Sequence, residues 1–564
     1  MKIENNKTIK LSAEKYDLNF YKDRPYVGIR NKEGNLLMDL YLVSSCNTLE
    51  GRDVVSNISD WNYEESQGQI TFTATADSSI WKSKEYKIVC KEDRFEYSFD
   101  INGKGSIDEV EYFSGYYTGS LRWSSGRFYS SFIVDKIFNP EPDCKEEFYS
   151  LPSETTGIDL TGVPIYGKDH WFFTPPPFSF VGIKDNVKFT IGVKAEERNW
   201  LFTEFIYKGG KGSYLSLSYE GHTKIEGEYS LPKIVFIFGE DEYELLKTYS
   251  DLNRVNRKSY EQPSWWKTPI FCGWGAQCAL EVKTGEPASK LATEENYYGF
   301  LNKLREINLN PGIIVIDDKW QKNYGLNDVD KEKWPDMKNF IKDVHNNGKK
   351  VLLWLKAWDP EGVSEELCIR DFKGNKLAVD PTNPEYGKIF RACIKNILSK
   401  EGLDADGFKI DFTARIPSGA YCKSYGNLWG LELMKKYLEI IHTEAKKVKR
   451  DALIISHTPN PYLENVTDMI RLNDVNTSAD INNAMLHRAR VAKAACPSLV
   501  IDTDNWPMPN KKAWLDYIKL QPELGVPSLY YIDLIDNSKE EITEEEHKVI
   551  RKAWDAFERG EKYE

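Results

Sequence analysis

The segment DADGFKIDFTARIP (404–417) shows the pattern on which the fold of the C-terminal half depends. A short apolar run ends on a carboxylate, Asp411, and the chain then becomes polar. Lys409 has the same side-chain parity as Asp411, because alternate residues of a strand point to the same side. The segment therefore predicts a buried strand that ends with two charged side chains facing the same way.

Apolar segments of this kind alternate with amphipathic stretches of helical period from residue 263 to residue 564. The eight predicted strands are 268–276, 312–318, 349–357, 406–411, 452–456, 468–474, 498–504 and 528–534. The predicted helices include 335–347, 384–400, 428–448, 480–494 and 543–560, the last with a capping box at Thr543 and Glu546. Repeated strand–helix units predict a (β/α)8 TIM barrel. A doubly wound sheet is the alternative, but no Gly-rich phosphate loop follows any strand.

Residues 1–240 have a different period. Segments such as 68–77, 85–103, 188–197 and 213–221 alternate apolar and polar residues, which predicts an N-terminal β-sandwich of the supersandwich kind. Residues 241–262 read as a linking helix, and 263–564 form the predicted catalytic barrel. The fold class is thus multidomain α+β, as expected for 564 residues. It stays open whether N-terminal loops near Trp171 and Phe172 complete the site.

Composition narrows the classes of partner. The net charge is −12 and no long basic run occurs, which argues against nucleic acid and anionic membranes as partners. No run of about 18 apolar residues predicts a membrane span. The nine cysteines are dispersed, without CxxC or Cys/His metal spacing. Such a set is typical of reduced thiols and predicts a cytoplasmic location.

The predicted strand ends are unusually acidic. TIM-barrel active sites lie at the C-terminal ends of the strands. The carboxylates at these ends are Asp317, Asp318, Asp411, Asp474, Asp502, Asp504 and Asp533. Converging carboxylates without a His-rich set indicate either metal binding or glycoside chemistry. A retaining glycosidase needs two carboxyl groups about 5–5.5 Å apart, one as nucleophile and one as acid/base.

Asp411 and Asp474 are the candidates for this pair. The ammonium of Lys409 would hold Asp411 ionised as the nucleophile, although a structural Lys–Asp ion pair is equally consistent with the pattern. Asp474 as acid/base should have a raised pKa. Its alternative is an N-cap of the following helix, a role that Asp480 fits better.

The pattern leaves the roles of four further residues open. Asp317 and Asp318 could bind a metal, cap a helix or hold sugar hydroxyls. Trp320 beside them could stack on a sugar ring. His457 is either a site residue or a surface histidine.

These segments resemble the α-galactosidases of glycoside hydrolase families 27 and 36, the melibiases. VIDDKWQ (315–321) resembles their DDGW segment, and 349–366 resembles their GLWFEPE region. GFKIDF (407–412) matches the strand that carries the nucleophile, and IRLNDVNTSADI (470–481) stands where the clan has its acid/base. WWKTPIFCGWGA (265–276) resembles the first barrel strand, and the preceding sandwich resembles the family 36 N-terminal domain.

The resemblance implies a retaining, exo-acting α-galactosidase that cleaves small oligosaccharides through a glycosyl-aspartate intermediate. It implies Asp411 as nucleophile and Asp474 as acid/base, with no metal and no cofactor. The predicted substrate-binding residues are Asp317, Asp318, Trp320, Trp354, Lys409 and Arg471. An oligosaccharide or glycoside is the expected partner, and relatives are often homo-oligomers.

The departures from the family pattern lie at sugar-facing positions. Lys319 replaces the glycine of DDGW, and Lys356 stands in the GLWFEPE region. The terminal sugar therefore stays open among α-galactoside, α-glucoside, β-L-arabinopyranoside, N-acetylgalactosaminide and an anionic sugar. The other hypotheses are a transglycosylase of the raffinose-synthase type, a non-catalytic sugar-binding protein, and a metal-dependent hydrolase, for which no HxH spacing is present.

Overall fold

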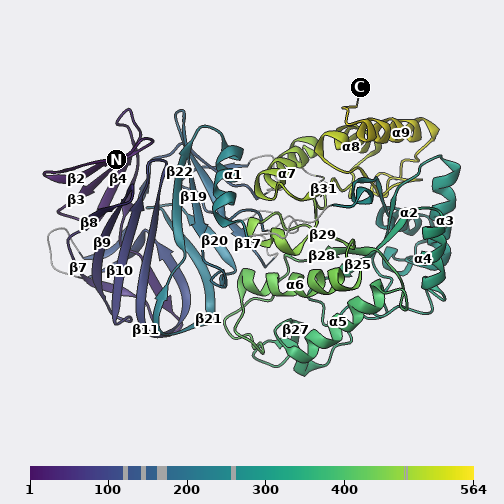
Figure 1. Cartoon of the computed structure of the whole chain (residues 1–564), viewed down its shortest axis with the longest axis horizontal. Coiled ribbons are helices and arrows are strands. Elements are labelled where there is room, and N and C mark those ends of the chain that lie inside the picture. Colours follow the sequence, from purple (N-terminus) through teal and green to yellow (C-terminus); the bar gives the residue numbers. More distant parts are fainter. Residues whose placement is uncertain are drawn as a thin grey trace.

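The computed structural model describes residues 1–118, 125–141, 148–161, 175–255, 262–475, 477 and 480–563. Figure 1 shows a sheet-rich N-terminal half beside a barrel surrounded by helices. The predicted fold class, a β-sandwich followed by a TIM barrel, is confirmed. Trp171 and Phe172 lie outside the described residues.

The N-terminal half contains two sheets, which are antiparallel except for the parallel pair of β12 and β7 in the larger one. The smaller has the order β1 (Lys2–Asn5), β2 (Thr8–Ser12), β3 (Asp17–Tyr21), β4 (Tyr26–Arg30), β5 (Leu36–Tyr41) and β14 (Ser131–Phe132). The path through the larger sheet is β13 (Gly126–Tyr129), β12 (Ser114–Tyr117), β7 (Val54–Ile58), β9 (Gln69–Ser78), β10 (Ser83–Cys90), β11 (Arg94–Tyr112), β22 (Lys233–Gly239), β19 (Val187–Lys194), β18 (Ser179–Lys184), β15 (Lys136–Phe138) and β16 (Tyr149–Ser150). Its other strands are β6 (Ser45–Thr48), β8 (Asn62–Ser66), β17 (Thr156–Asp159), β20 (Glu204–Lys208) and β21 (Tyr214–Ser230).

The core of this half is largely aromatic. Along β10, buried side chains alternate with more exposed ones, as the sequence period predicts. The rings of Phe95 and Phe236 stack with centroids 4.5 Å apart, and both are almost fully buried. Burial of such rings contributes about 1.5–3 kcal/mol each and explains most of the high aromatic content.

The C-terminal half is a nearly closed barrel of eight parallel strands. Their order is β31 (Val500–Asp502), β30 (Met469–Arg471), β29 (Leu453–Ser456), β28 (Gly407–Asp411), β25 (Lys350–Lys356), β24 (Ile313–Ile316), β23 (Ile270–Cys272) and β32 (Ser528–Leu529). A parallel bridge between Asp502 and Val526 joins the ends of this order. The surrounding helices are α2 (Gly273–Thr284), α3 (Glu294–Glu306), α4 (Met337–Asn346), α5 (Pro384–Leu398), α6 (Gly430–Val448), α7 (Ile481–Ala495), α8 (Lys511–Leu524) and α9 (Glu544–Arg559). A short hairpin, β26 (Cys368–Arg370) and β27 (Lys376–Val379), lies between β25 and α5.

Two predicted strands are too long. The first ends at Cys272, and α2 begins at once at Gly273. A Cβ atom at Gly273 would lie 2.0 Å from the Tyr297 hydroxyl, so the helix can approach its neighbour this closely only with glycine there. The last strand ends at Leu529 rather than residue 534.

Two predicted helix caps are confirmed. Asp480 accepts a hydrogen bond from the Asn483 amide at 3.1 Å, which makes Asp480 the N-cap of α7. Glu546 accepts from the Thr543 amide at 2.7 Å at the start of α9.

The two halves meet through α1 (Glu242–Asn253) and several polar contacts. Helix α1, which is shorter than the predicted linking helix, lies between the halves in Figure 1. The Tyr243 hydroxyl contacts His487 Nδ1 at 2.9 Å. Glu220 from β21 accepts from Trp429 Nε1 at 2.9 Å and from the Gly419 amide at 3.0 Å. The N-terminal half thus contacts the loop that follows β28.

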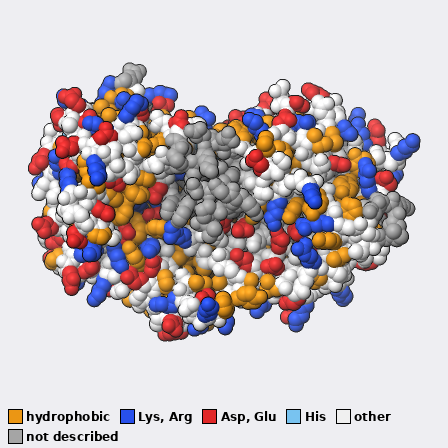
Figure 2. Space-filling view, turned by 180° about the vertical axis from the view of Figure 1, so that it is seen from behind, with side chains coloured by type: hydrophobic (Ala, Val, Ile, Leu, Met, Phe, Trp, Pro, Cys, Tyr) orange, Lys and Arg blue, Asp and Glu red, His pale blue; other side chains and the backbone are white. Residues whose placement is uncertain are grey.

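The described surface does not point to a polyanion as partner. On the face in Figure 2, basic and acidic side chains are mixed over both halves and form no large basic patch. No helix in the described ranges is long and apolar enough to cross a membrane. The described cysteines are free thiols.

Buried ion pairs hold the N-terminal ends of the barrel strands. Asp406, immediately before β28, accepts from His345 Nε2 at 2.6 Å, from Lys350 Nζ at 3.1 Å and from the Val351 amide at 3.0 Å. Although burial raises its pKa, these partners lower it to about 2. Because this end of the barrel is opposite the catalytic end, its role is structural.

Replacing Asp406 with Asn is expected to lower the free energy of unfolding by about 1.5–3 kcal/mol at pH 7, because the buried carboxylate loses its charge-assisted bonds with Lys350 and Lys449, which are themselves partly exposed. Urea titration measures this loss. The folded pKa is depressed, so the stabilisation is present above the unfolded value of about 3.9 and should be lost as the pH falls towards 2. Asp404→Asn is the matched control, because that carboxylate pairs with Lys449 but is 31% exposed. An equal loss in both variants would contradict the assignment.

Candidate active site

One buried arginine joins the two predicted catalytic carboxyl groups. Asp411 is the last residue of β28, Arg471 is the last of β30, and Asp474 follows three residues later. Arg471 Nη2 donates to Asp411 Oδ1 at 2.8 Å, and Nη1 donates to Asp474 Oδ1 at 3.1 Å. The Arg471 side chain is 1% exposed. The structure therefore brings these three predicted residues together at the C-terminal mouth of the barrel.

Asp411 is held as an ionised carboxylate. Trp354 Nε1 donates to its Oδ2 at 3.1 Å, and the Phe412 amide donates to its Oδ1 at 3.0 Å. Burial alone would raise its pKa, but nearby positive charge, led by Arg471, lowers the pKa to about 2. His457 Nε2 lies 3.6 Å from Asp411 Oδ1, and burial lowers the pKa of this histidine to about 3. At neutral pH His457 is therefore uncharged, and Arg471 and Lys409 supply the positive charge.

Asp474 has the opposite tendency. Burial raises its pKa to about 7; the negative charges of Asp411 and Asp504 add to this effect, while Arg471 opposes it. The side chain stays 26% exposed, so a substrate can reach it. Two neighbouring carboxyl groups whose pKa values are pushed apart fit the roles of nucleophile and acid.

Lys409 does not pair with Asp411, contrary to the ion pair predicted from parity. Its Nζ donates to Asp317 Oδ2 at 2.7 Å and to Cys272 Sγ at 3.4 Å. Lys409 and Asp317 are each 4% exposed. Parity fixes the side to which a residue points but not its partner. Asp317, directly after β24 and two strands away from β28 in the barrel, is that partner. Lys409 acts on Asp411 through its charge.

Asp317 and Asp318 point to different surroundings. Asp317 bonds to Lys409 inside the barrel. Asp318 Oδ1 accepts from the Tyr324 hydroxyl at 2.6 Å, and burial raises the pKa of Asp318 to about 6. Asp318 is therefore the member of the pair with the more accessible carboxyl group.

Three residues that the sequence suggested for the site do not have the suggested role. Trp320 is fully buried and donates from Nε1 to the Trp354 carbonyl at 2.8 Å, so it offers no ring face for stacking. Trp354 is 1% exposed and orients Asp411 through its indole. Asp533 forms surface ion pairs with Lys303 and Lys283 instead of joining the carboxylates.

The chain has left-handed backbone conformations where three site strands end. Phe412 follows β28 with φ 61°, Asn473 follows β30 with φ 67°, and Asp504 follows β31 with φ 55°. Such residues cost on the order of 1–3 kcal/mol each and gather at functional sites. The turns direct the chain away from the barrel axis directly beside the carboxyl groups.

Sequence reasoning missed Tyr324 and the contact of Asp504 with Arg471. Tyr324 lies in a loop without periodicity, so no pattern could have indicated it. The ammonium groups of Lys319 and Lys356 lie 4.1 and 4.4 Å from the centroid of its ring. They also pair with Glu361 and Asp359, each at 2.7 Å.

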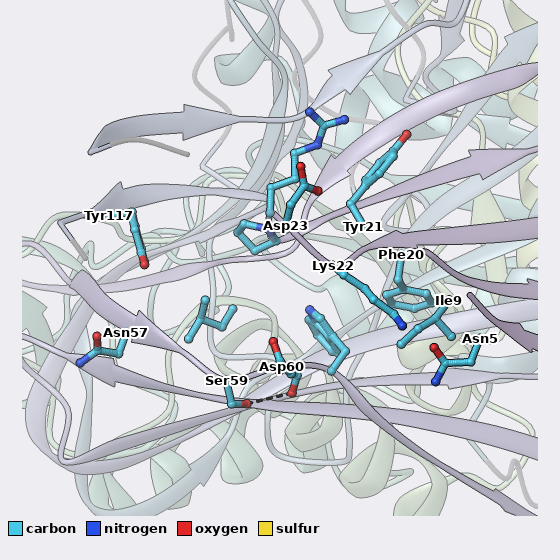
Figure 3. Close-up of a pocket in the computed structure, with 14 residues that line it drawn as sticks. Asn5, Ile9, Phe20, Tyr21, Lys22, Asp23, Asn57, Ser59, Asp60 and Tyr117 are labelled. Carbon is cyan, nitrogen blue, oxygen red and sulfur yellow. Dashed lines mark hydrogen bonds between the residues drawn. The ribbon is translucent and has the colours of Figure 1, made fainter. Parts of the chain in front are cut away.

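Figure 3 shows a separate groove in the N-terminal half, with a volume of about 620 Å³. Phe20, Tyr117 and Asp60 are among its lining residues. None of the predicted site residues lines it, so the candidate chemistry belongs to the barrel. Among the described residues, no group of three or more His, Cys, Asp or Glu is arranged to hold a metal ion.

Comparisons with known proteins give a family match for the barrel and similar folds for most of the chain. The family model described as glycosyl hydrolases family 31 TIM-barrel domain matches residues 282–457. The α-xylosidase XylQ from Lactiplantibacillus pentosus is 26% identical over 27% of this chain and 23% of the xylosidase. The chain thus aligns with about a quarter of the length of this curated relative.

Two solved structures show the same fold over most of the chain. A family 31 sulfoquinovosidase from E. rectale superposes with a TM-score of 0.62 at 14% identity, covering 99% of this chain and 83% of that one. The α-galactosidase TtGalA from Thermus thermophilus superposes with a TM-score of 0.52 at 13% identity, covering 87% of this chain and 99% of that one.

The fold, the acidic barrel mouth and the matched barrel model together support the class of glycoside hydrolase. Family 31 is the family indicated by the model match. The matching family model is that of family 31, so it does not support the resemblance to families 27 and 36 that the sequence motifs suggested.

Proposed function

We propose that the protein is a retaining, exo-acting glycoside hydrolase for an α-linked terminal sugar. The observation that carries the proposal is the shared contact of Arg471 with Asp411, whose pKa is lowered, and Asp474, whose pKa is raised. One group is then ionised and the other protonated near neutral pH, as a double-displacement mechanism requires.

In the first step, a carboxylate oxygen of Asp411 attacks the anomeric carbon and the bond from that carbon to the leaving oxygen breaks. Asp474 gives its proton to the leaving oxygen. In the second step, the Asp474 carboxylate takes a proton from water, whose oxygen attacks the anomeric carbon and releases Asp411. Arg471 balances negative charge that passes between the two carboxyl groups.

Asp318 is the proposed contact for hydroxyls of the terminal sugar. Its carboxyl group is half-buried and already oriented by the Tyr324 hydroxyl. Asp317 and Lys409 bond to each other below the mouth, and their role is to support the charge of the site. Trp354 orients Asp411.

The sugar is a finer part of the proposal. The sequence resemblance favours an α-galactoside, while the matched relative is named as an α-xylosidase. A sugar with an anionic substituent is a second candidate, because Lys319 and Lys356 flank Tyr324, the partner of Asp318. The sulfoquinovosidase among the similar structures accords with this second candidate.

The test is a screen against p-nitrophenyl glycosides with Asp411→Asn as control. The panel contains the α-galactoside, α-glucoside, α-xyloside and β-L-arabinopyranoside, with α-glycosides carrying a carboxylate or sulfonate. Release by the wild-type protein but not the variant supports the function and identifies the sugar. Product analysis with a sugar acceptor separates hydrolysis from transglycosylation. No release from the full panel counts against the function.

The pH dependence of kcat/KM on an active glycoside is expected to be bell-shaped. Asp411 must be ionised and Asp474 protonated, so activity should fall as the pH rises through about 7 and stay high well below pH 5. Initial rates across a constant-ionic-strength buffer series measure the two limbs. A basic limb that begins above pH 9 would contradict the role of Asp474.

A further inference from the structure

Asp504 forms the shortest contact with the arginine that links the catalytic pair. Its Oδ2 accepts from Arg471 Nη1 at 2.5 Å, the same nitrogen that reaches Asp474 Oδ1 at 3.1 Å. Asp411 takes the other terminal nitrogen at 2.8 Å. Nη1 therefore donates one of its two hydrogens to Asp504 and the other to Asp474, within a guanidinium that is almost fully enclosed.

The chain fixes the Asp504 carboxylate in this position. Asp504 follows β31 and is 0% exposed. Its Oδ1 accepts from the amides of Asn505 and Trp506 at 2.6 and 3.1 Å, and its own amide donates to Asp502 Oδ1 at 2.9 Å. Gln521 Nε2 from α8 donates to its carbonyl at 2.8 Å. A side chain held at both oxygens and along its backbone cannot turn away from Arg471.

We propose that Asp504 is a positioning residue that holds Arg471 between the two catalytic carboxyl groups and offsets the positive charge that Arg471 presents to Asp474. This inference rests on the proposed function of the site. Asp504 does not need to touch the substrate, because it acts through the guanidinium.

The physical reason is the balance of charge around Asp474. The positive charge of Arg471 alone would favour the ionised form of Asp474 and remove the proton that the leaving group needs. Asp504 offsets that charge through its bond to Nη1, and its own negative charge also favours the protonated form of Asp474. The charged or titratable groups that face this network are Arg471, Asp411, Asp474, Asp502, Lys409, His457, Arg488, Tyr517 and Tyr530.

Asp504→Asn tests the inference, because it removes the charge while keeping the shape. The substrate is a glycoside that the wild-type protein cleaves in the screen, and kcat/KM is measured as a function of pH. The basic limb is expected to move to lower pH by at least about one unit, since an opposite charge shifts a carboxyl pKa by about 1–3 units. Asp504→Glu, which keeps the charge, should return the limb towards its wild-type position.

Asp468→Asn is the matched control. Asp468 is a fully buried carboxyl immediately before β30 that accepts from Lys446 Nζ at 2.7 Å and from the Ile454 amide at 3.1 Å, at the opposite end of the strand from Arg471. Its loss should lower thermal stability while leaving the basic limb at its wild-type position. If Asp504→Asn does not fold, Asp504→Ser, which is smaller and also neutral, is measured instead.

The outcomes separate the two proposals. If Asp504→Asn lowers the activity but leaves the basic limb unchanged, Asp504 has only a structural role. Absence of glycosidase activity in the wild-type protein would instead overturn the proposed function, with no bearing on the contacts. A displaced limb in Asp504→Asn that Asp504→Glu restores supports the positioning role.

Discussion

Asp411→Asn is expected to lower kcat on the active glycoside by on the order of 10⁴-fold or more without unfolding the protein. An amide cannot form the glycosyl-enzyme ester. The substitution is nearly isosteric, and the amide oxygen can still accept from Arg471 and from the Phe412 amide, so that only the bond from Trp354 is lost. Stopped assays with long incubation measure the residual rate, and circular dichroism checks the fold.

A matched control variant and a chemical rescue experiment test this expectation further. Asp533→Asn changes another aspartate near a strand end, but one that is 33% exposed and paired with surface lysines. It should keep near-normal activity. In Asp411→Gly, added azide should restore turnover and yield a glycosyl azide of inverted anomeric configuration, visible by NMR. Near-normal turnover of Asp411→Asn would remove Asp411 from the nucleophile role.

The eight barrel strands were predictable because each is a short apolar run with a polar end. The sandwich was predictable because its period of two persists over long strands such as β11 and β21. The strand boundaries were less predictable. The first strand looked longer because Gly273 and its neighbours are apolar, whereas close packing against Tyr297 begins a helix there.

The candidate site was partly predictable for a related reason. A carboxylate at the end of a buried strand must reach the barrel mouth, and this argument found Asp411. The partner of Lys409 was mispredicted because parity along β28 contains no information about the side chains of β24. Trp320 was placed at the mouth because of its neighbours in sequence, yet the chain turns after Asp318 and buries it.

The contacts of Arg471 depend on three separate strand ends and could not be predicted from the sequence. β28, the residues after β30 and the residues after β31 each supply one carboxyl group to it. The sequence shows seven acidic residues at strand ends but not which of them share a cation. That selection depends on barrel geometry and on the turns at Phe412, Asn473 and Asp504.

Asp474→Ala is expected to have an effect that depends on the leaving group. General acid catalysis contributes about 10²–10⁴-fold, so glycosides of poorly acidic alcohols should lose activity by this amount. A 2,4-dinitrophenyl glycoside leaves without a proton, and its first step should remain fast. The second step then becomes slow, because no base activates water, and the glycosyl-enzyme should accumulate as a burst of dinitrophenol.

The pH profile distinguishes this role from that of a structural residue. Without Asp474, the basic limb near pH 7 should disappear, because the group whose ionisation produces it is absent. Azide should accelerate turnover and give a product of retained configuration, opposite to the product from Asp411→Gly, since it attacks the intermediate from the side that water uses. Equal losses for good and poor leaving groups, with the basic limb intact, would mean that Asp474 only positions Arg471.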